Sequence, residues 1–279
     1  MLGIVDVGGG MKAVYSAGIY DYLIDRQVKF DYGIGVSAGA SNMISYVTGQ
    51  RGRDYTYYAD STFRKDYMGM WSLLHTGSYL NLDYIYTTLC NTGGDYPIDY
   101  TAFCRTAMRY YIVATDAQTG EPRYFDNSDI RLDSYEALKA SCAIPVACRP
   151  PLVYGRPYFD GGVADPVPYK KALADGCDRL VVLLMRPADE PKQPEKFTGA
   201  MSLFLKKYPA VMGKIKNRHV VYNDAVAELK KLEKEGRALI VSPSDTCGVG
   251  TFTKDREAYR RLYEKGYRDA EKIGGFAAG

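Results

Sequence analysis

The sequence predicts an α/β fold with a mainly parallel central sheet. Two short apolar segments, at 3–7 and 32–36, have the length and composition of buried strands. Between them, residues 11–25 repeat apolar side chains at helical spacing, and a second helix is expected from Ser37 to about Thr48. The order strand, helix, strand, helix is typical of parallel strands joined by right-handed crossovers.

The rest of the chain continues the alternation of strands and helices. Further strands are expected at 110–115, 123–125, 152–159, 180–185 and 239–242. Further helices are expected at 134–140, 169–175, 224–235 and 254–272, and the proline-bearing stretch 186–196 reads as a surface loop. We expect a single domain over 1–279, with its core at about 1–185, an aromatic insertion at about 50–105 and a helical C-terminal extension at about 197–279.

Composition excludes several classes of protein. The 279 residues are 46% hydrophobic and 25% charged with a net charge of +3, which is ordinary for a soluble globular protein and requires no nucleic-acid partner. The six cysteines are scattered without a Cys-x-x-Cys pair or a neighbouring histidine, so we expect neither a metal site nor a disulfide framework, and no cofactor. No apolar stretch approaches the roughly 20 residues of a membrane span. A cytoplasmic location is therefore expected.

The segment Gly35-Val36-Ser37-Ala38-Gly39 matches Gly-x-Ser-x-Gly and lies between a predicted strand and a predicted helix. In such a nucleophile elbow, the serine stands at the apex of a strained turn and its hydroxyl projects from the sheet. The N–H groups at the start of the following helix face the place where negative charge develops. The alternative is a plain helix start in which Ser37 is only the N-cap residue.

A second glycine turn, Gly8-Gly9-Gly10, follows the first predicted strand and continues with Met11 and Lys12. If the strands at 3–7 and 32–36 are parallel neighbours, the backbone N–H groups of this turn lie beside Ser37 and provide an oxyanion hole. The N–H group of Ala38 is the natural addition. Phosphate binding is the rival interpretation, but neither Gly-x-x-x-x-Gly-Lys-Ser/Thr nor Gly-x-Gly-x-x-Gly is matched.

A serine nucleophile needs a base, and Asp160 is the best candidate. It ends a predicted strand and is followed by two glycines that permit a tight turn. An exposed aspartate is a weak base at neutral pH, so Asp160 must be partly desolvated, as its neighbour Phe159 suggests. The two histidines, His75 and His219, are the alternative, but His219 lies in a basic stretch without turn signals and His75 in the aromatic insertion. Both are expected to be surface or packing residues.

These three motifs, in this order, resemble the patatin-like phospholipase family. The runs Ala-Thr-Asp at 114–116, Ala-Ser-Cys-Ala-Ile-Pro at 140–145 and Gly-Gly-Val-Ala-Asp-Pro-Val-Pro at 161–168 also look like its bacterial members. The resemblance covers about 1–185 and implies a three-layer αβα fold, a Ser37–Asp160 dyad and an oxyanion hole at the glycine loop. In the family, the glycine loop commonly continues with an arginine. Here Lys12 stands in that position, and it keeps the positive charge but lacks the planar, forked set of donors of an arginine side chain.

The resemblance implies a serine acyl hydrolase of lipase, phospholipase A, lysophospholipase or carboxylesterase type that acts on lipid or ester substrates without a cofactor. The aromatic insertion is expected either to form a groove for an acyl chain or merely to pack on the sheet. A basic run from Lys206 to Arg218 is either a solvated helix face or a site of transient contact with a membrane surface. The alternative function is a catalytically idle lipid-binding or regulatory protein of the same family.

Overall fold

The computed structural model describes residues 1–196 and 199–278. Within them the chain forms an eight-stranded mixed sheet in the order β5-β6-β3-β2-β1-β7-β8, with β4 paired to β3. The strands are β1 (Leu2–Asp6), β2 (Tyr32–Val36), β3 (Arg109–Asp116), β4 (Pro122–Phe125), β5 (Leu152–Val153), β6 (Arg156–Asp160), β7 (Arg179–Leu183) and β8 (Ala238–Val241). The predicted mainly parallel α/β sheet is confirmed, because β3, β2, β1, β7 and β8 all pair in parallel.

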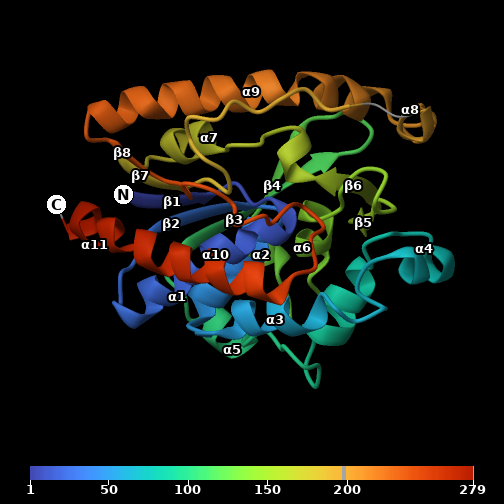
Figure 1. Ribbon diagram of the computed structural model, residues 1–279, viewed down its shortest axis with the longest axis horizontal. Coiled ribbons are helices and arrows are strands. Elements are labelled where there is room, and N and C mark those ends of the chain that lie inside the picture. Colours follow the sequence, from blue (N-terminus) through green and yellow to red (C-terminus); the bar gives the residue numbers. More distant parts are fainter. Residues whose placement is uncertain (197–198, 279) are drawn as a thin grey trace.

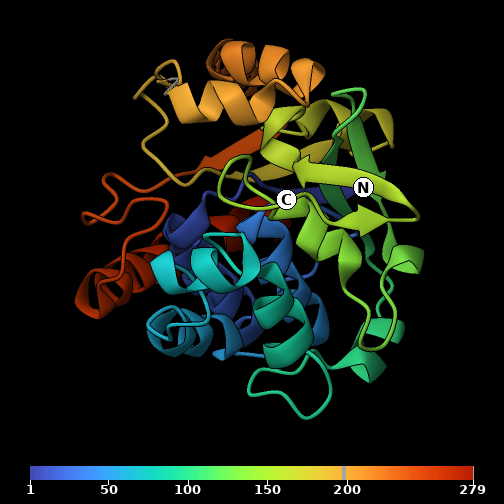
Figure 2. The ribbon, with the colours of Figure 1, turned by 90° about the vertical axis from the view of Figure 1, so that its right-hand side faces the viewer.

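Helices cover both faces of the sheet (Figure 1). On one face lie α7 (Tyr169–Ala174) and the long α9 (Pro209–Lys234). On the other face lie α1 (Val14–Asp25), α2 (Ala38–Thr48), α6 (Glu136–Ser141) and α10 (Arg256–Asp269), with α3 (Arg53–Ser61) and α5 (Tyr100–Cys104) packed outside them. Figure 2 shows the sheet between these two layers when the molecule is turned by 90°. The remaining helices, α4 (Met70–Thr76), α8 (Gly199–Leu205) and α11 (Glu271–Ala278), lie at the periphery.

The central strands are apolar because both of their faces are covered. Ile4 packs towards α1 and α2, whereas the next residue, Val5, packs towards α7 and α9. All five residues of β2 are buried. This two-sided burial explains why the sequence of these strands is a continuous apolar run without polar alternation.

The segment after β7 belongs to the same packing arrangement. Its strand β8 extends the sheet beside β7, α9 covers one face, and α10 packs against α1 on the other. The predicted extension begins at 197 and ends at 279, and residues 197, 198 and 279 lie outside the described residues. No helix in the described ranges has both the length and the apolar content needed to cross a bilayer.

Three predicted elements differ from the structure. The helix expected at 254–272 is divided at Ala270 into α10 and α11. The single strand expected at 152–159 is a hairpin of β5 and β6, because the backbone turns at Tyr154 and Gly155, both with positive φ. The helix expected at 224–235 is the last part of α9, which begins fifteen residues earlier at Pro209. The basic residues of its first half obscured the helical pattern of buried positions there.

Candidate active site

Ser37 occupies the turn between β2 and α2. β2 ends at Val36 and α2 begins at Ala38, so a single residue carries the change of direction. Its backbone has φ 55° and ψ −132°, a conformation that residues other than glycine rarely adopt. Such strain costs on the order of 1–3 kcal/mol and persists only where the surroundings impose it. The strained strand-to-helix turn agrees with the nucleophile elbow expected from the sequence.

The surroundings of the turn impose this conformation in two ways. The N–H group of Ser37 donates a hydrogen bond to Oγ of Ser141 (2.8 Å), and the Ser141 hydroxyl donates to the carbonyl oxygen of Val113 (2.6 Å). On the helical side, a Cβ on Gly39 would lie 2.3 Å from Oδ1 of Asp6. Only glycine therefore lets α2 approach β1 this closely.

Asp160 is the last residue of β6, and β3 lies between it and Ser37. β6 runs antiparallel to β3 and pairs Asp160 with Ala114. On the other side of β3, Val113 pairs with Val36, the residue before Ser37. The two side chains thus flank β3 at the same level and border the same cavity, where the Ser37 hydroxyl acts to lower the pKa of Asp160. The structure brings together the two residues that the sequence singled out.

The Asp160 carboxylate is buried, with 6% of its surface exposed. Burial raises the pKa of Asp160 above its ordinary value, because the charged form loses its hydration. The nearby Arg218 guanidinium, the Ser37 hydroxyl and the Gly162 N–H group, which donates at 2.8 Å, oppose that rise in pKa. The carboxylate is therefore a stronger base than an exposed aspartate, while neighbouring donors stabilise its charged form.

The glycine loop after β1 is held in place by two of its own N–H groups. Gly8 donates to Oδ1 of Asp6 (2.9 Å), and Met11 donates to the carbonyl oxygen of Thr251 (3.1 Å). Both groups are therefore engaged within the protein, although the sequence marked them as donors to a substrate. By contrast, the N–H groups of Gly9 and Gly10 have no acceptor within the described part of the chain.

The N–H group of Ala38 is likewise without an acceptor among the described residues, as expected for the first residue of a helix. Gly9 and Gly10 border the cavity that contains Ser37, and Ala38 borders the apolar pocket next to it. The three amides form a group of unengaged donors around the serine. A group of this kind suits an oxyanion that develops on a substrate.

Two cavities meet at Ser37. The larger, about 160 Å³, is bordered by the glycine loop, Asp160 and several charged side chains. The smaller is apolar, and half of its lining residues come from the aromatic insertion, namely Tyr57, Tyr58, Tyr67, Leu80, Leu82, Ile85 and Tyr86. Gly10, Ser37 and Ile144 border both cavities. The serine therefore stands between a polar compartment and an apolar one.

The polar compartment contains residues that the sequence did not single out as site residues. Arg186, Lys192 and Glu195 come from the stretch expected to be a surface loop, and Arg218 comes from the basic run of α9. One signal could have identified Arg218. It lies three residues after the buried Ile215 and four before the buried Tyr222, and so on the side of α9 that faces the sheet.

Both histidines lie away from this constellation. His75 is exposed on α4, where its ring stacks on Trp71 at 3.8 Å. His219 lies on α9 beside Arg218, and it is not among the described residues that border either cavity. Cys142 borders the apolar pocket, where its thiol, whose pKa burial raises to about 12, is hydrogen-bonded with the Tyr86 hydroxyl at 3.0 Å.

The chain is similar to several known proteins and to two family models. A family model described as "Patatin-like phospholipase" matches residues 7–173, and one described as "Domain of unknown function (DUF6363)" matches residues 208–273. The "Uncharacterized protein YjjU" of Escherichia coli (strain K12) is 26% identical over 201 residues, which are 70% of this chain. The chain spans 55% of that relative's length. The crystal structure of VipD from Legionella pneumophila is similar with a TM-score of 0.47 and 13% identity, over 97% of this chain and 66% of that one.

Proposed function

Because this chain belongs to the patatin-like phospholipase family, we propose that it is a serine acyl hydrolase that cleaves acyl esters of lipids. The observation that carries the proposal is that Ser37 and the buried Asp160 border one cavity, next to unengaged backbone amides and an apolar pocket. A nucleophile, a base, oxyanion donors and room for an acyl chain are the components that ester hydrolysis requires.

In the acylation step, Oγ of Ser37 attacks the ester carbonyl carbon while the Asp160 carboxylate takes the hydroxyl proton. The carbonyl oxygen becomes negative and accepts hydrogen bonds from the amides of Gly9, Gly10 and Ala38. One such donor typically lowers the barrier by about 3 kcal/mol. The tetrahedral intermediate collapses, the alcohol leaves with the proton held by Asp160, and the acyl group remains on Ser37.

In the deacylation step, a water molecule attacks the acyl-enzyme and gives its proton to Asp160. The second tetrahedral intermediate collapses, the fatty acid leaves, and the Asp160 proton returns to Oγ of Ser37. Burial favours this cycle because it makes the carboxylate more basic. The apolar pocket between the elbow and the insertion suits the acyl chain, whose methylene groups are each stabilised there by about 0.8 kcal/mol.

The proposal is tested with a fluorophosphonate probe. Oγ of Ser37 is expected to displace fluoride from the probe and to carry one phosphonyl group per chain, measured by intact-protein mass spectrometry. Ser37→Ala should take up none, and Ser45→Ala, which changes a buried serine on the far part of α2, serves as the control that keeps full labelling.

The same experiment discriminates the alternative of a catalytically idle lipid-binding protein. An idle protein would bind lipids yet leave Ser37 unlabelled and would release no p-nitrophenol from p-nitrophenyl esters. Hydrolysis that persists at the wild-type rate in Ser37→Ala would reject the acyl-enzyme mechanism outright.

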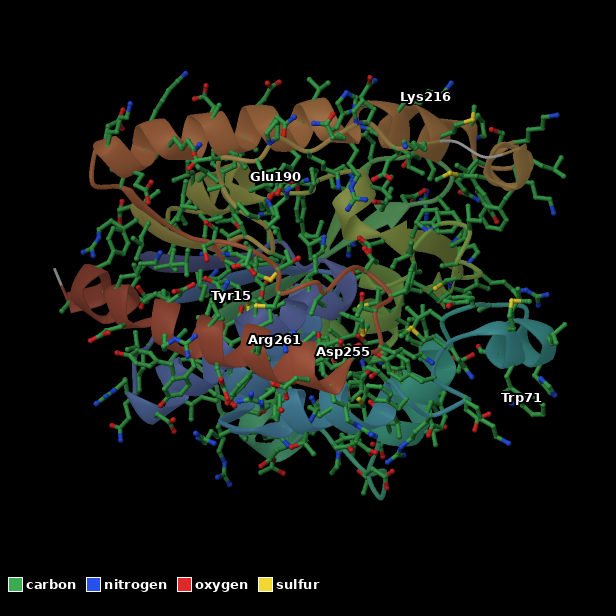
Figure 3. All side chains as sticks on the ribbon, in the orientation of Figure 1. Tyr15, Trp71, Glu190, Lys216, Asp255 and Arg261 are labelled. Atoms are coloured by element: carbon green, nitrogen blue, oxygen red, sulfur yellow. The ribbon has the colours of Figure 1, made fainter. Side chains whose placement is uncertain are left out.

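We also propose that α4 contacts the lipid surface from which the substrate comes. The helix exposes four apolar side chains, Met70, Trp71, Leu73 and Leu74, and Leu74 is 76% exposed. Lys65 lies 4.6 Å from the Trp71 ring, a pairing suited to an anionic interface. Trp71 lies at the outer edge of the molecule (Figure 3).

The position of α4 connects this surface with the acyl pocket. The segment that contains α4 lies between Met68 and Leu80, and an antiparallel β-bridge joins these two residues. Leu80, together with Tyr67 just before the bridge, lines the apolar pocket beside Ser37. A lipid surface in contact with α4 would therefore lie next to the apolar pocket.

Changing Trp71→Asp together with Leu74→Asp is expected to lower the fraction of protein bound to phosphatidylglycerol vesicles by at least about tenfold. Each apolar side chain that enters the interface contributes about 1.5–3 kcal/mol. Cosedimentation measures the bound fraction, and hydrolysis of a water-soluble ester reports that the fold is kept. Val220→Asp with Val221→Asp, an apolar pair on α9 in which each side chain is 46% exposed, is the matched control. Equal loss of binding in both double variants would contradict a specific role of α4.

A further inference from the structure

The polar cavity beside Ser37 is lined by four cationic side chains. They are Lys12 from the glycine loop, Arg186 and Lys192 from the segment after β7, and Arg218 from α9. A Cβ built on Gly9 would lie 3.4 Å from Cε of Lys12, and one on Gly162 would lie 2.8 Å from Nη2 of Arg218. The cations therefore reach the oxyanion loop on one side of the serine and the turn after Asp160 on the other.

The carboxylates near these cations do not balance their charge. Glu190 lies 3.2 Å from Arg186, and Glu195 lies 3.7 Å from Lys192 and 3.6 Å from Arg218. Lys12 forms no ion pair with any described residue. Two glutamates thus face four cations, which leaves a surplus of two positive charges before the Asp160 carboxylate is counted.

Because these cations are partly buried, their surplus positive charge is unfavourable in free energy unless an anion binds beside them. Burial, followed by the neighbouring cations, lowers the pKa of Lys12 and lowers that of Lys192 to about 8. The Nε groups of Arg186 and Arg218 are buried and have no hydrogen-bond partner among the residues that the structure describes. Buried donors without acceptors are rare in folded proteins, and an anion bound in this cavity would give both donors an acceptor. The cavity offers both the donors and the charge that an anion needs.

We propose that this cationic cavity binds a phosphate monoester on the alcohol part of the lipid ester, so that the preferred substrates are acylglycerol phosphates. This inference rests on the proposed acyl hydrolase function. A phosphate monoester carries a charge of about −1.5 to −2 at pH 7, opposite in sign to the surplus charge of the cavity, and guanidinium groups bind its oxygens in pairs. A lipid with an acyl chain in the apolar pocket and its phosphate in the cationic cavity has its ester bond at Ser37.

The C-terminal segment matched at 208–273 acquires a role under this proposal. Arg218 and Tyr222 of α9 line the cationic cavity, and Thr251 both lines it and accepts the Met11 N–H group of the glycine loop. The segment would therefore select the substrate and brace the oxyanion loop. The residues matched at 7–173 would supply the nucleophile and the base.

The kinetic test compares three esters with the same acyl chain: monoacylglycerol, monoacylglycerol phosphate and monoacylglycerol phosphocholine, at pH 7. Wild-type kcat/KM is expected to be highest for the phosphate. Arg218→Gln and Arg186→Gln should each lower the ratio of kcat/KM for the phosphate over that for monoacylglycerol by about 10- to 100-fold, as loss of a charge-assisted hydrogen bond does. Arg218→Lys should recover part of the ratio.

The matched control is Lys216→Gln, which removes the same charge from the outer side of α9 (Figure 3). Its ratio should stay within twofold of wild type. The proposal is overturned if the wild-type enzyme hydrolyses all three esters equally, or if Lys216→Gln lowers the ratio as much as Arg218→Gln does.

A binding test separates this proposal from the hydrolase function itself. Calorimetry on the Ser37→Ala protein measures the affinity for monoacylglycerol phosphate and for inorganic phosphate. Tighter binding of the lipid than of inorganic phosphate, weakened at least tenfold by Arg186→Gln, supports the cavity as a lipid phosphate site even if no ester is hydrolysed. Equal binding of both ligands would make it a site for free phosphate and would overturn the substrate assignment.

Discussion

Asp160→Asn is expected to lower kcat for ester hydrolysis by about 10³- to 10⁴-fold, because the amide cannot take the proton of Ser37. The substitution keeps the size of the side chain and leaves an oxygen that can still accept the Gly162 N–H group. The fold should therefore be retained, as circular dichroism and thermal unfolding would show. Initial rates on a short p-nitrophenyl ester measure the loss.

The controls for this variant separate a dyad from a triad. His75→Ala and His219→Ala change residues outside both cavities and should keep wild-type rates. The double variant Ser37→Ala with Asp160→Asn should be no slower than Ser37→Ala alone, since residues that act as a unit are not additive. A rate that falls with His219→Ala but survives Asp160→Asn would contradict the assignment of the base.

The dependence on pH provides an independent readout of the same carboxylate. Catalysis requires the charged form, and burial raises the pKa of Asp160 above the ordinary value of 3.8. As pH falls, kcat/KM for a neutral ester should therefore begin to decrease at a higher pH than for an exposed aspartate. Arg218→Gln removes the charge that opposes this rise in pKa, so it should move the acid limb further upward, whereas Lys216→Gln should leave it in place.

Gly8→Ala is expected to have the second largest effect, a fall in kcat of about 100-fold accompanied by a lower melting temperature. Gly8 has φ +60°, and a Cβ there would lie 2.1 Å from the carbonyl oxygen of Val36, directly before Ser37. The oxyanion loop and the elbow must then separate, and a misplacement of about 1 Å costs roughly this factor. Steady-state kinetics and thermal unfolding measure the two consequences.

Gly213→Ala is the matched control, since Gly213 lies in α9 and a Cβ there would meet no atom within 4 Å. It should keep full activity and raise the free energy of unfolding slightly, because alanine favours the helix by up to about 1 kcal/mol. An active and equally stable Gly8→Ala protein would mean that the loop and the elbow do not need their close contact.

Local patterns in the sequence were sufficient for much of the fold. The strand at 32–36 agrees residue for residue with β2, and Ser37 stands at the turn that the glycine spacing predicted. These features depend on neighbouring residues, since periodicity and turn residues act over a few positions along the chain. The family resemblance added the pairing of Ser37 with Asp160, 123 positions later in the sequence.

Other features of the site were decided by the tertiary structure. No local pattern shows that β6 runs antiparallel to β3 and thereby brings Asp160 level with Ser37. No local pattern shows either which N–H groups of the glycine loop are available to a substrate. The N–H groups of Gly8 and Met11 are not, because they donate hydrogen bonds to Asp6 and Thr251.

The sequence and the tertiary structure also determined different parts of the candidate site. The sequence determined on its own that a strained serine turn, a glycine loop and a candidate base are present. Only the tertiary structure decided that Arg186, Lys192 and Arg218 converge on them, because a surface loop and a helix register place these side chains through contacts between segments far apart in the chain. The physical reason is that turn chemistry is local, whereas burial and electrostatic surroundings are properties of the assembled fold.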